Sequence, residues 1–241
     1  MSLYGLSFSD DTDTTAANRT NTLTAYGLFL AEEGFAVSAP EVQEDFISIK
    51  GLDGGLDVSD SPQGFPTYKR RKLTARLYRA ASPYKSDDAA AIMAMASTLQ
   101  TAWGGRQVRI YTPDTAMYYW HGRPSFGFDI PGGYITLEAD IFPYKLFAEM
   151  KGAYYTVTPS TDILSDIVNE QRYVIPTITV SAATVIRLRA GTASDSGEIT
   201  LAAGTWNDPR LILYPGRNGL KAWTVSASSG TLDIEWKTGR L

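Results

Sequence analysis

The chain has 241 residues, of which 44% are hydrophobic, 20% are charged and none is cysteine, and its formal net charge is −4. At roughly 100–200 residues per domain, this length predicts one large or two small domains, and we expect two. The composition excludes a disordered polymer, disulfides and thiolate metal sites, and it disfavours non-specific nucleic-acid binding, which requires clustered Lys and Arg.

Short alternations of apolar and polar residues run through the chain and predict a mainly β fold. In residues 135–141, Ile135, Leu137 and Ile141 alternate with polar side chains, which is the period of a strand with one buried face. Similar alternations predict strands at residues 46–50, 73–79, 106–111, 177–180, 185–190 and 232–237. Glycine-rich turn sequences separate them, as at residues 53–55, 131–133 and 217–219.

One segment, residues 86–103, has the period of an α-helix instead. Ser86 is a favourable N-cap, and the glycine pair at 104–105 ends the helix. The apolar stripe of this helix consists of Ile92, Ala96, Leu99 and Trp103. We expect the stripe to face a hydrophobic core, because surface helices usually bury one face, and not to line a ligand pocket.

The character of the chain changes near residue 150, where the helix and an excess of basic residues have both passed. We therefore predict two domains, residues 1–150 and residues 151–241. The second contains about seven or eight short strands divided by turn signals, a spacing that indicates a β-sandwich.

Charge is segregated along the first half of the chain. Residues 1–68 hold 2 basic and 11 acidic side chains, a net charge of −9, whereas residues 69–123 hold 10 and 3, a net charge of +7. Two interpretations stay open. The segregation is an accident of loop composition, or it lets an acidic face of one subunit dock on a basic face of the next, as in head-to-tail rings.

The sequence offers no constellation for catalysis. The single histidine, His121, lies in an aromatic run before Gly122 and Arg123, which we interpret as a strand edge that enters a turn, and no Gly-x-Ser-x-Gly motif accompanies it. Paired carboxylates of a glycosidase are not excluded, because their pairing is spatial, so an enzyme remains the third reading of the chain. We nevertheless expect no catalytic residue.

Cofactor and metal motifs are also incomplete. The glycine-rich residues 51–57 lack the Gly-Lys-Ser/Thr ending of a phosphate-binding loop. The acidic residues Asp10, Asp11 and Asp13 lack the glycine and distal glutamate of a calcium loop. No stretch approaches the ~18 apolar residues of a membrane span, and the first residues do not form a signal peptide. We expect no cofactor, no metal site and no membrane span.

Exposed tryptophans would suit a carbohydrate-binding module, the alternative function. Trp206, beside Asn207 in an expected loop, is the strongest candidate for stacking on a sugar ring. Trp236 is the weakest, because it continues the apolar phase of Leu232 and Ile234 and should face the core.

The order of several short motifs resembles that of the distal tail protein family of siphophages. A strand enters a Gly-x-Asp-Gly turn at residues 47–57, and a basic segment leads into a strand at 68–73. The later motifs are the helix at 86–105, an aromatic-Gly-Arg segment at 119–123, a strand with Asp, Pro and Tyr at 139–145, and the segments 175–180, 211–218 and 234–241. The resemblance covers nearly the whole chain, although each motif alone is short.

This resemblance implies an N-terminal β-sandwich with one α-helix and an extended arm, followed by a galectin-like β-sandwich. It implies a structural virion protein at the distal end of the tail of a phage or prophage. Six copies, in one ring or in stacked rings, would join the tail tube protein to the tail-tip hub, a lysin-like protein, or to a baseplate that attaches to the host. Longer members of the family insert carbohydrate-binding modules, for which 241 residues leave no room.

The segregated charges then suggest an interface between subunits. We expect the acidic residues Asp53, Asp57 and Asp60 to face a basic group on a neighbouring subunit. That basic group consists of Lys69, Arg70, Arg71 and Lys72. The alternative is that the two segments pair with each other in a hairpin of one chain.

Overall fold

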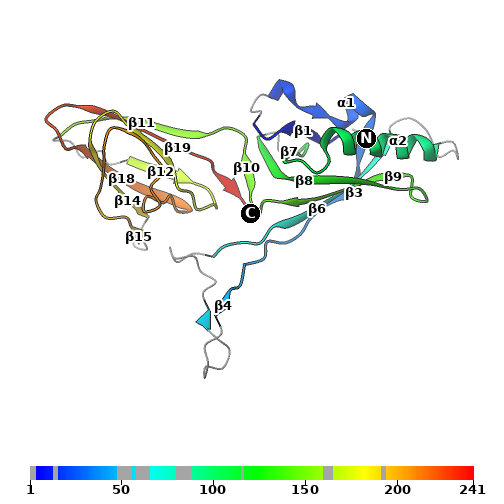
Figure 1. Cartoon of the computed structure of the whole chain (residues 1–241), viewed down its shortest axis with the longest axis horizontal. Coiled ribbons are helices and arrows are strands. Elements are labelled where there is room, and N and C mark those ends of the chain that lie inside the picture. Colours follow the sequence, from blue (N-terminus) through cyan, green and yellow to red (C-terminus); the bar gives the residue numbers. More distant parts are fainter. Residues whose placement is uncertain are drawn as a thin grey trace. The chain divides into compact units, whose positions relative to one another are not determined.

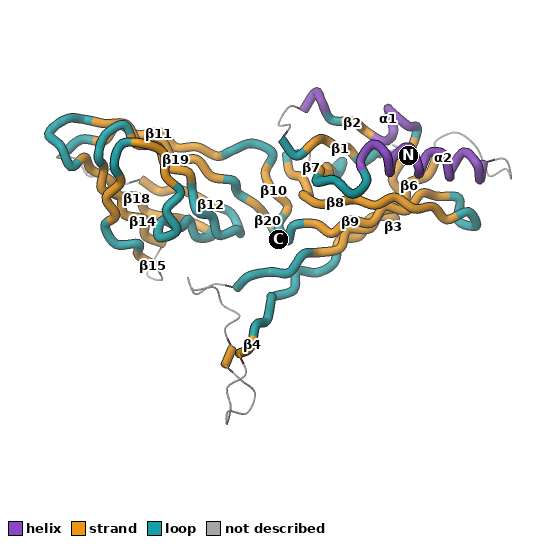
Figure 2. Tube along the Cα trace, viewed as in Figure 1, coloured by secondary structure: helices purple, strands orange, loops and turns teal. Residues whose placement is uncertain are grey.

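The computed structural model describes residues 4–12, 16–47, 56–57, 66–79, 88–114, 117–159, 165–190 and 194–241. The chain divides into two compact units, Met1–Lys145 and Leu146–Leu241 (Figure 1). Strands dominate both units, as Figure 2 shows, so the prediction of a mainly β fold is confirmed. The boundary predicted after residue 150 falls five residues beyond this division.

The first unit is built on one antiparallel sheet with the strand order β2-β1-β7-β8-β9-β6-β3. Its strands are β1 (Ser7–Asp10), β2 (Thr20–Asn21), β3 (Leu28–Val37), β4 (Phe46–Ile47), β5 (Leu56–Asp57), β6 (Arg71–Arg79), β7 (Val108–Tyr111), β8 (Tyr118–Asp129) and β9 (Tyr134–Ile141). Its helices are a 3-10 helix (Ala16–Asn18), α1 (Thr22–Tyr26) and α2 (Asp88–Trp103). The small pair β4-β5 is separate from the sheet.

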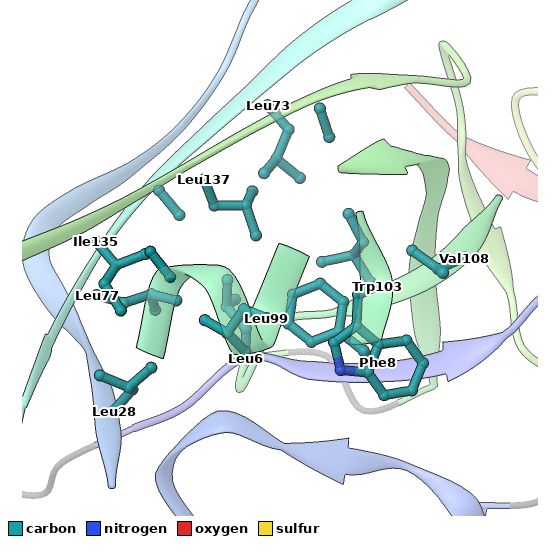
Figure 3. Packing of buried hydrophobic residues seen from close by; sticks show 14 of the residues in the cluster. Leu6, Phe8, Leu28, Leu73, Leu77, Leu99, Trp103, Val108, Ile135 and Leu137 are labelled. Carbon is teal, nitrogen blue, oxygen red and sulfur yellow. The ribbon is translucent and has the colours of Figure 1, made fainter. Parts of the chain in front are cut away.

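The core of this unit lies between the two ends of the sheet and helix α2. Figure 3 shows Phe8 of β1 beside Trp103 of α2, with Leu73 and Leu137 on the opposite side of the core. The rings of Phe8 and Trp103 stack with centroids 5.7 Å apart. Because β1 and β6 contribute to one apolar cluster, the ladder of strands wraps around that cluster.

Helix α2 buries the stripe that its sequence predicts. Ile92, Ala96, Leu99 and Trp103 are all buried, so this prediction is confirmed. The helix ends where Gly105 takes a φ of 71°, a conformation that glycine adopts without steric cost. The expected start at Ser86 lies outside the described residues, and the helix is described from Asp88.

The end of α2 also closes an edge of the sheet. Strand β7 pairs with β8 only as far as Gly122, so β7 does not cover the backbone of β8 beyond that residue. The Gly105 amide donates to the Pro124 carbonyl at 2.9 Å, and the Phe126 amide donates to Oε1 of Gln100 at 2.8 Å. The helix terminus thus satisfies backbone groups that an exposed edge would offer to other chains.

The aromatic-Gly-Arg segment at 119–123 is not a turn, which corrects the sequence interpretation. It lies inside β8, where Gly122 pairs with Ile141 of β9. A Cβ at Gly122 would lie 2.6 Å from the Asp140 carbonyl oxygen. The glycine is therefore explained by the close approach of a neighbouring strand and not by a chain reversal.

Strands β3 and β6 continue outward as a two-stranded ribbon that carries the β4-β5 pair (Figure 1). Val42 forms a bridge with Tyr68, and the Lys69 amide donates to the Glu41 carbonyl at 2.9 Å. The described side chains at residues 38–45 are all exposed in the single subunit. This ribbon corresponds to the extended arm that the family resemblance implies.

The second unit contains two antiparallel sheets. Its strands are β10 (Lys145–Phe147), which spans the division, β11 (Lys151–Val157), β12 (Ser165–Asn169), β13 (Thr177–Val180), β14 (Thr184–Ala190), β15 (Ser194–Asp195), β16 (Ile199–Leu201), β17 (Gly204–Trp206), β18 (Gly216–Thr224), β19 (Gly230–Trp236) and β20 (Gly239–Arg240). The first sheet has the order β11-β19-β13-β17, and the second has the order β12-β18-β14-β15, with β16 paired to β14.

A separate apolar cluster joins these sheets. It includes Ile178 and Ile234 of the first sheet and Ile186 and Leu220 of the second. Trp236 also belongs to it, as its phase on the strand predicts. The predicted number of seven or eight strands was too low, because β15, β17 and β20 have only two or three residues and are too short to show a period.

Candidate assembly surface

The basic segment at 69–72 lies where the ribbon joins the sheet. Lys69 and Arg70 precede β6, and Lys72 is the second residue of that strand. All three side chains are exposed. Nζ of Lys69 lies 3.8 Å from Oε2 of Glu41 on the other ribbon strand. An exposed pair at this distance contributes little to folding, so it does not prevent these cations from meeting another partner.

Arg71 differs from its neighbours, and the prediction that it faces another subunit is corrected. Its guanidinium is buried, and Nε donates to the Ser38 carbonyl at 2.6 Å. A second nitrogen, Nη1, donates to the Pro143 carbonyl at 3.3 Å, and Cζ lies 5.1 Å from the ring centroid of Trp120. Burial lowers the pKa of Arg71 from its ordinary value. This cation therefore anchors the ribbon to its own sheet.

The acidic half of the expected interface is described only in part. Asp57 is in β5, where it pairs with Phe46. Asp53 and Asp60 lie outside the described residues. In the described ribbon, the strand opposite the basic segment is formed by residues 38–43 and not by the segment that holds these aspartates. The described contacts therefore give no support to the hairpin alternative, and the contact with a neighbour stays a proposal.

A shallow polar groove of about 120 Å³ extends from Lys72 across the outer face of the sheet. Its charged residues are Lys72 of β6, Arg123 of β8, and Glu138 and Asp140 of β9. Strand register places Lys72 and Arg123 on either side of Asp140, so cationic and anionic side chains alternate across three strands. Such a surface can meet a protein of mixed charge in a fixed register.

His121 of β8 pairs with Arg109 of β7 and belongs to a cluster of polar and aromatic side chains. Its Nε2 is 2.8 Å from Oδ1 of Asp11, and Nε of Arg109 is 3.9 Å from the same oxygen. The ring of His121 meets that of Tyr119 edge to face. The pKa of His121 is lowered, chiefly by burial and also by the nearby charge of Arg109, although Asp11 acts in the opposite direction. These contacts give His121 a structural role.

Trp206 is not in a loop, contrary to the sequence interpretation. It ends the edge strand β17, where it pairs with Ile178. Its side chain is 40% exposed, and Nε1 donates to the Ala202 carbonyl at 2.8 Å. Strand β17 has only three residues, which are too few to show an alternation of apolar and polar side chains. The sequence therefore indicated a loop at Trp206.

Metal and membrane features were sought in the described part of the chain. In those ranges no group of three or more His, Asp or Glu side chains is placed to hold a metal ion. Similarly, none of the helices described there is long and apolar enough to cross a bilayer.

The fold of this chain is similar to that of a known phage protein. No protein-family model matches the sequence, and no curated protein does either. Among solved structures, the chain is similar to the SPP1 Dit protein, described as a paradigm of the hub adsorption apparatus in phages that infect Gram-positive bacteria. The match has a TM-score of 0.53 and 15% sequence identity, and it covers 96% of this chain and 98% of the other. The likeness establishes a shared fold.

Proposed function

We propose that this chain is a structural, non-enzymatic subunit at the distal end of the tail of a long-tailed phage or prophage. In this proposal six copies form a ring that joins the tail tube to the tail-tip hub or baseplate. The observation that carries the proposal is the likeness to SPP1 Dit, which extends over 96% of this chain and 98% of that protein. If the two proteins shared only one domain, the match would not cover nearly the whole of both chains. The second unit would correspond to the galectin-like domain of the family.

The ribbon supports a role in assembly. A two-stranded ribbon is marginally stable alone in water, and all described side chains at residues 38–45 are exposed in the single subunit. Val42, at 40% exposure, is an apolar residue in this exposed stretch. A neighbouring subunit that covered the ribbon would bury this surface and stabilise it.

The charges at the base of the ribbon provide candidate contacts. We infer that Lys69, Arg70 and Lys72 meet Asp53, Asp57 and Asp60 of the next copy in the ring. Arg71 is excluded from this set because it bonds within its own subunit. Contacts that place unlike charges opposite each other speed association and fix register, and they weaken as salt is raised.

The mass of the purified protein in solution tests the ring. Six subunits of 26.3 kDa would give an assembly of about six times that mass in size-exclusion chromatography with light scattering. We expect this species at low salt and a smaller one at higher salt. If the protein is monomeric alone, co-expression with its tail tube and hub proteins should give the ring. A monomer that enters no complex with either protein would contradict the proposal.

Substitution tests the charged contacts. The triple variant Lys69→Gln, Arg70→Gln and Lys72→Gln should lose the salt-sensitive assembly and keep the urea midpoint of the parent, because these side chains are exposed. A matched control removes three exposed cations of the second unit through Lys151→Gln, Arg210→Gln and Arg217→Gln. Equal assembly of the parent and the first variant at every salt concentration would rule out this interface.

A further inference from the structure

The second unit has a hollow on the outer face of its second sheet. Its volume is about 430 Å³, within the range of about 300–1,000 Å³ that is typical of small-molecule sites. The described residues that line this hollow come from three adjacent strands. They are Ser165 and Asp166 of β12, Arg187 and Arg189 of β14, and Gly219, Leu220 and Lys221 of β18.

Gly219 opens the centre of the hollow. The register aligns Asp166, Gly219 and Arg189 in one row across the three strands. Neighbouring strands lie about 4.8 Å apart, so Asp166 and Arg189 start about 10 Å from each other with no side chain between them. A Cβ at Gly219 would meet only the Arg189 carbonyl oxygen, at 3.6 Å, so the space above this residue is open.

The walls of the hollow are mainly basic. Register places Arg187 beside Lys221 in the row next to that of Arg189. Nε of Arg187 donates to Oδ1 of Asp195 at 2.8 Å, and hydrogen bonds from Arg187 and from the Gly197 amide lower the pKa of Asp195 to about 2. The side chain of Arg187 is therefore held in place at one side of the hollow by Asp195. Lys221 reaches over the ring of Trp223, with Nζ 5.3 Å from the centroid.

One carboxylate stands opposite these cations. Oδ2 of Asp166 accepts a hydrogen bond from Arg217 at 3.2 Å, and both side chains are more than half exposed. A carboxylate on one side and cations on the other recognise two kinds of group. Guanidinium and ammonium groups bind an oxyanion, and a carboxylate accepts hydrogen bonds from hydroxyls.

We propose that the hollow binds an acidic saccharide. Its phosphate or carboxylate group is held by Arg189 and Lys221, its ring lies over Gly219, and its hydroxyls donate to Asp166. This site is separate from Trp206, which is on the first sheet. It also does not depend on ring formation, so a failure of either proposal leaves the other standing.

Titration of the full chain with four probes tests the chemistry. The probes are glucose 6-phosphate, glucuronate, glucose and inorganic phosphate, and the Gly219 amide signal in NMR is the reporter. We expect at least one of the two acidic sugars to shift this signal at concentrations at least about tenfold below those that glucose or inorganic phosphate require. The acidic sugar that binds more tightly identifies the oxyanion. Equal binding of glucose, or of inorganic phosphate, would overturn the proposal, as would no binding of any acidic sugar.

Variants locate the site. Gly219→Leu should fill the hollow and abolish binding, whereas Gly152→Leu is the matched control, since a Cβ at Gly152 of β11 meets only the Ile234 carbonyl oxygen, at 3.9 Å. Calorimetry replaces the NMR reporter for these variants. Arg189→Gln and Lys221→Gln should each weaken binding about tenfold, with Lys151→Gln unchanged. Urea midpoints check that each variant is folded. Undiminished binding by folded Gly219→Leu would place the saccharide elsewhere and refute the assignment.

Discussion

His121 titrates below its ordinary range because burial disfavours its charged form. The pKa of this residue is lowered from 6.5, mainly by burial, and its contact with Asp11 only partly offsets the effect. The chain has no other histidine. Between pH 7.5 and 5.5 it is thus the one side chain whose unperturbed pKa lies in the range.

The depressed pKa predicts the direction in which stability depends on pH. As pH falls through 6.5, the unfolded chain takes up a proton before the folded chain does, so the free energy of unfolding should decrease. The variant His121→Gln should lose this part of the dependence. Urea unfolding at pH 7.5, 6.5 and 5.5 measures both proteins. Parallel curves for parent and variant would show that His121 does not cause the decrease.

Residue type alone did not predict the burial of Arg71 or the position of Trp206 on a strand. The sequence places four cations together at 69–72, but strand phase within β6 turns the guanidinium of Arg71 inward and leaves Lys72 exposed. Trp206 sits on an edge strand too short to display a period. The hollow around Gly219 was also missed, because its residues come from three strands whose register the sequence does not state.

Helix α2 packs against the core of the first unit through a single buried stripe. Leu99 is fully buried at the centre of the stripe, whereas Met93, about a quarter turn away from it, is 44% exposed. The helix closes the core between the two ends of the sheet, and it also covers an edge of β8 through Gln100. Packing and edge protection therefore depend on the same element.

The stripe predicts a contrast between two substitutions. Leu99→Ala should lower the free energy of unfolding by about 2–5 kcal/mol, because it leaves a cavity in a packed core. Met93→Ala should change it by less than about 1 kcal/mol, since this residue is 44% exposed and outside the buried stripe. Chemical denaturation monitored by tryptophan fluorescence compares the two. Similar losses for both would mean that α2 does not hold this core.

Elements with a strong period were predictable, and others were not. Strands β9 and β13 and helix α2 follow from alternation or from a helical stripe. The aromatic start of β8 was read as a strand edge, but the continuation of the strand was missed because Gly122 and Pro124 interrupt its pattern. Helix α1 was missed because five residues, capped by Asn21 and Gly27, are too few to show a period.

The described part of the chain forms two apolar cores with no residue in common. The first core consists of residues before Lys145, and the second lies between Val157 and Trp236. Each therefore draws its hydrophobic stabilisation from its own segment of the chain. The sequence indicated two domains through composition, but the division at 145–146 depends on contacts that composition does not contain.

Independent cores predict that the second unit folds alone. A fragment of residues 146–241 should unfold cooperatively in urea and keep the near-ultraviolet circular dichroism of buried Trp236. Ile234→Ala in this fragment should lower its midpoint, as Ile234 is fully buried in the second core. A fragment without a cooperative transition would show that the second core needs the first unit.

The absence of shared core residues has a consequence for how such genes diversify. A recombination crossover between the codons of Lys145 and Leu146 would fall inside β10, but it would exchange one described core for another and would split neither. Selection could then act on the exposed sheets of the second unit, including the surface around Gly219, while the ribbon and its anchoring Arg71 are inherited unchanged. We therefore expect related genes to show a discontinuity in sequence similarity at this position.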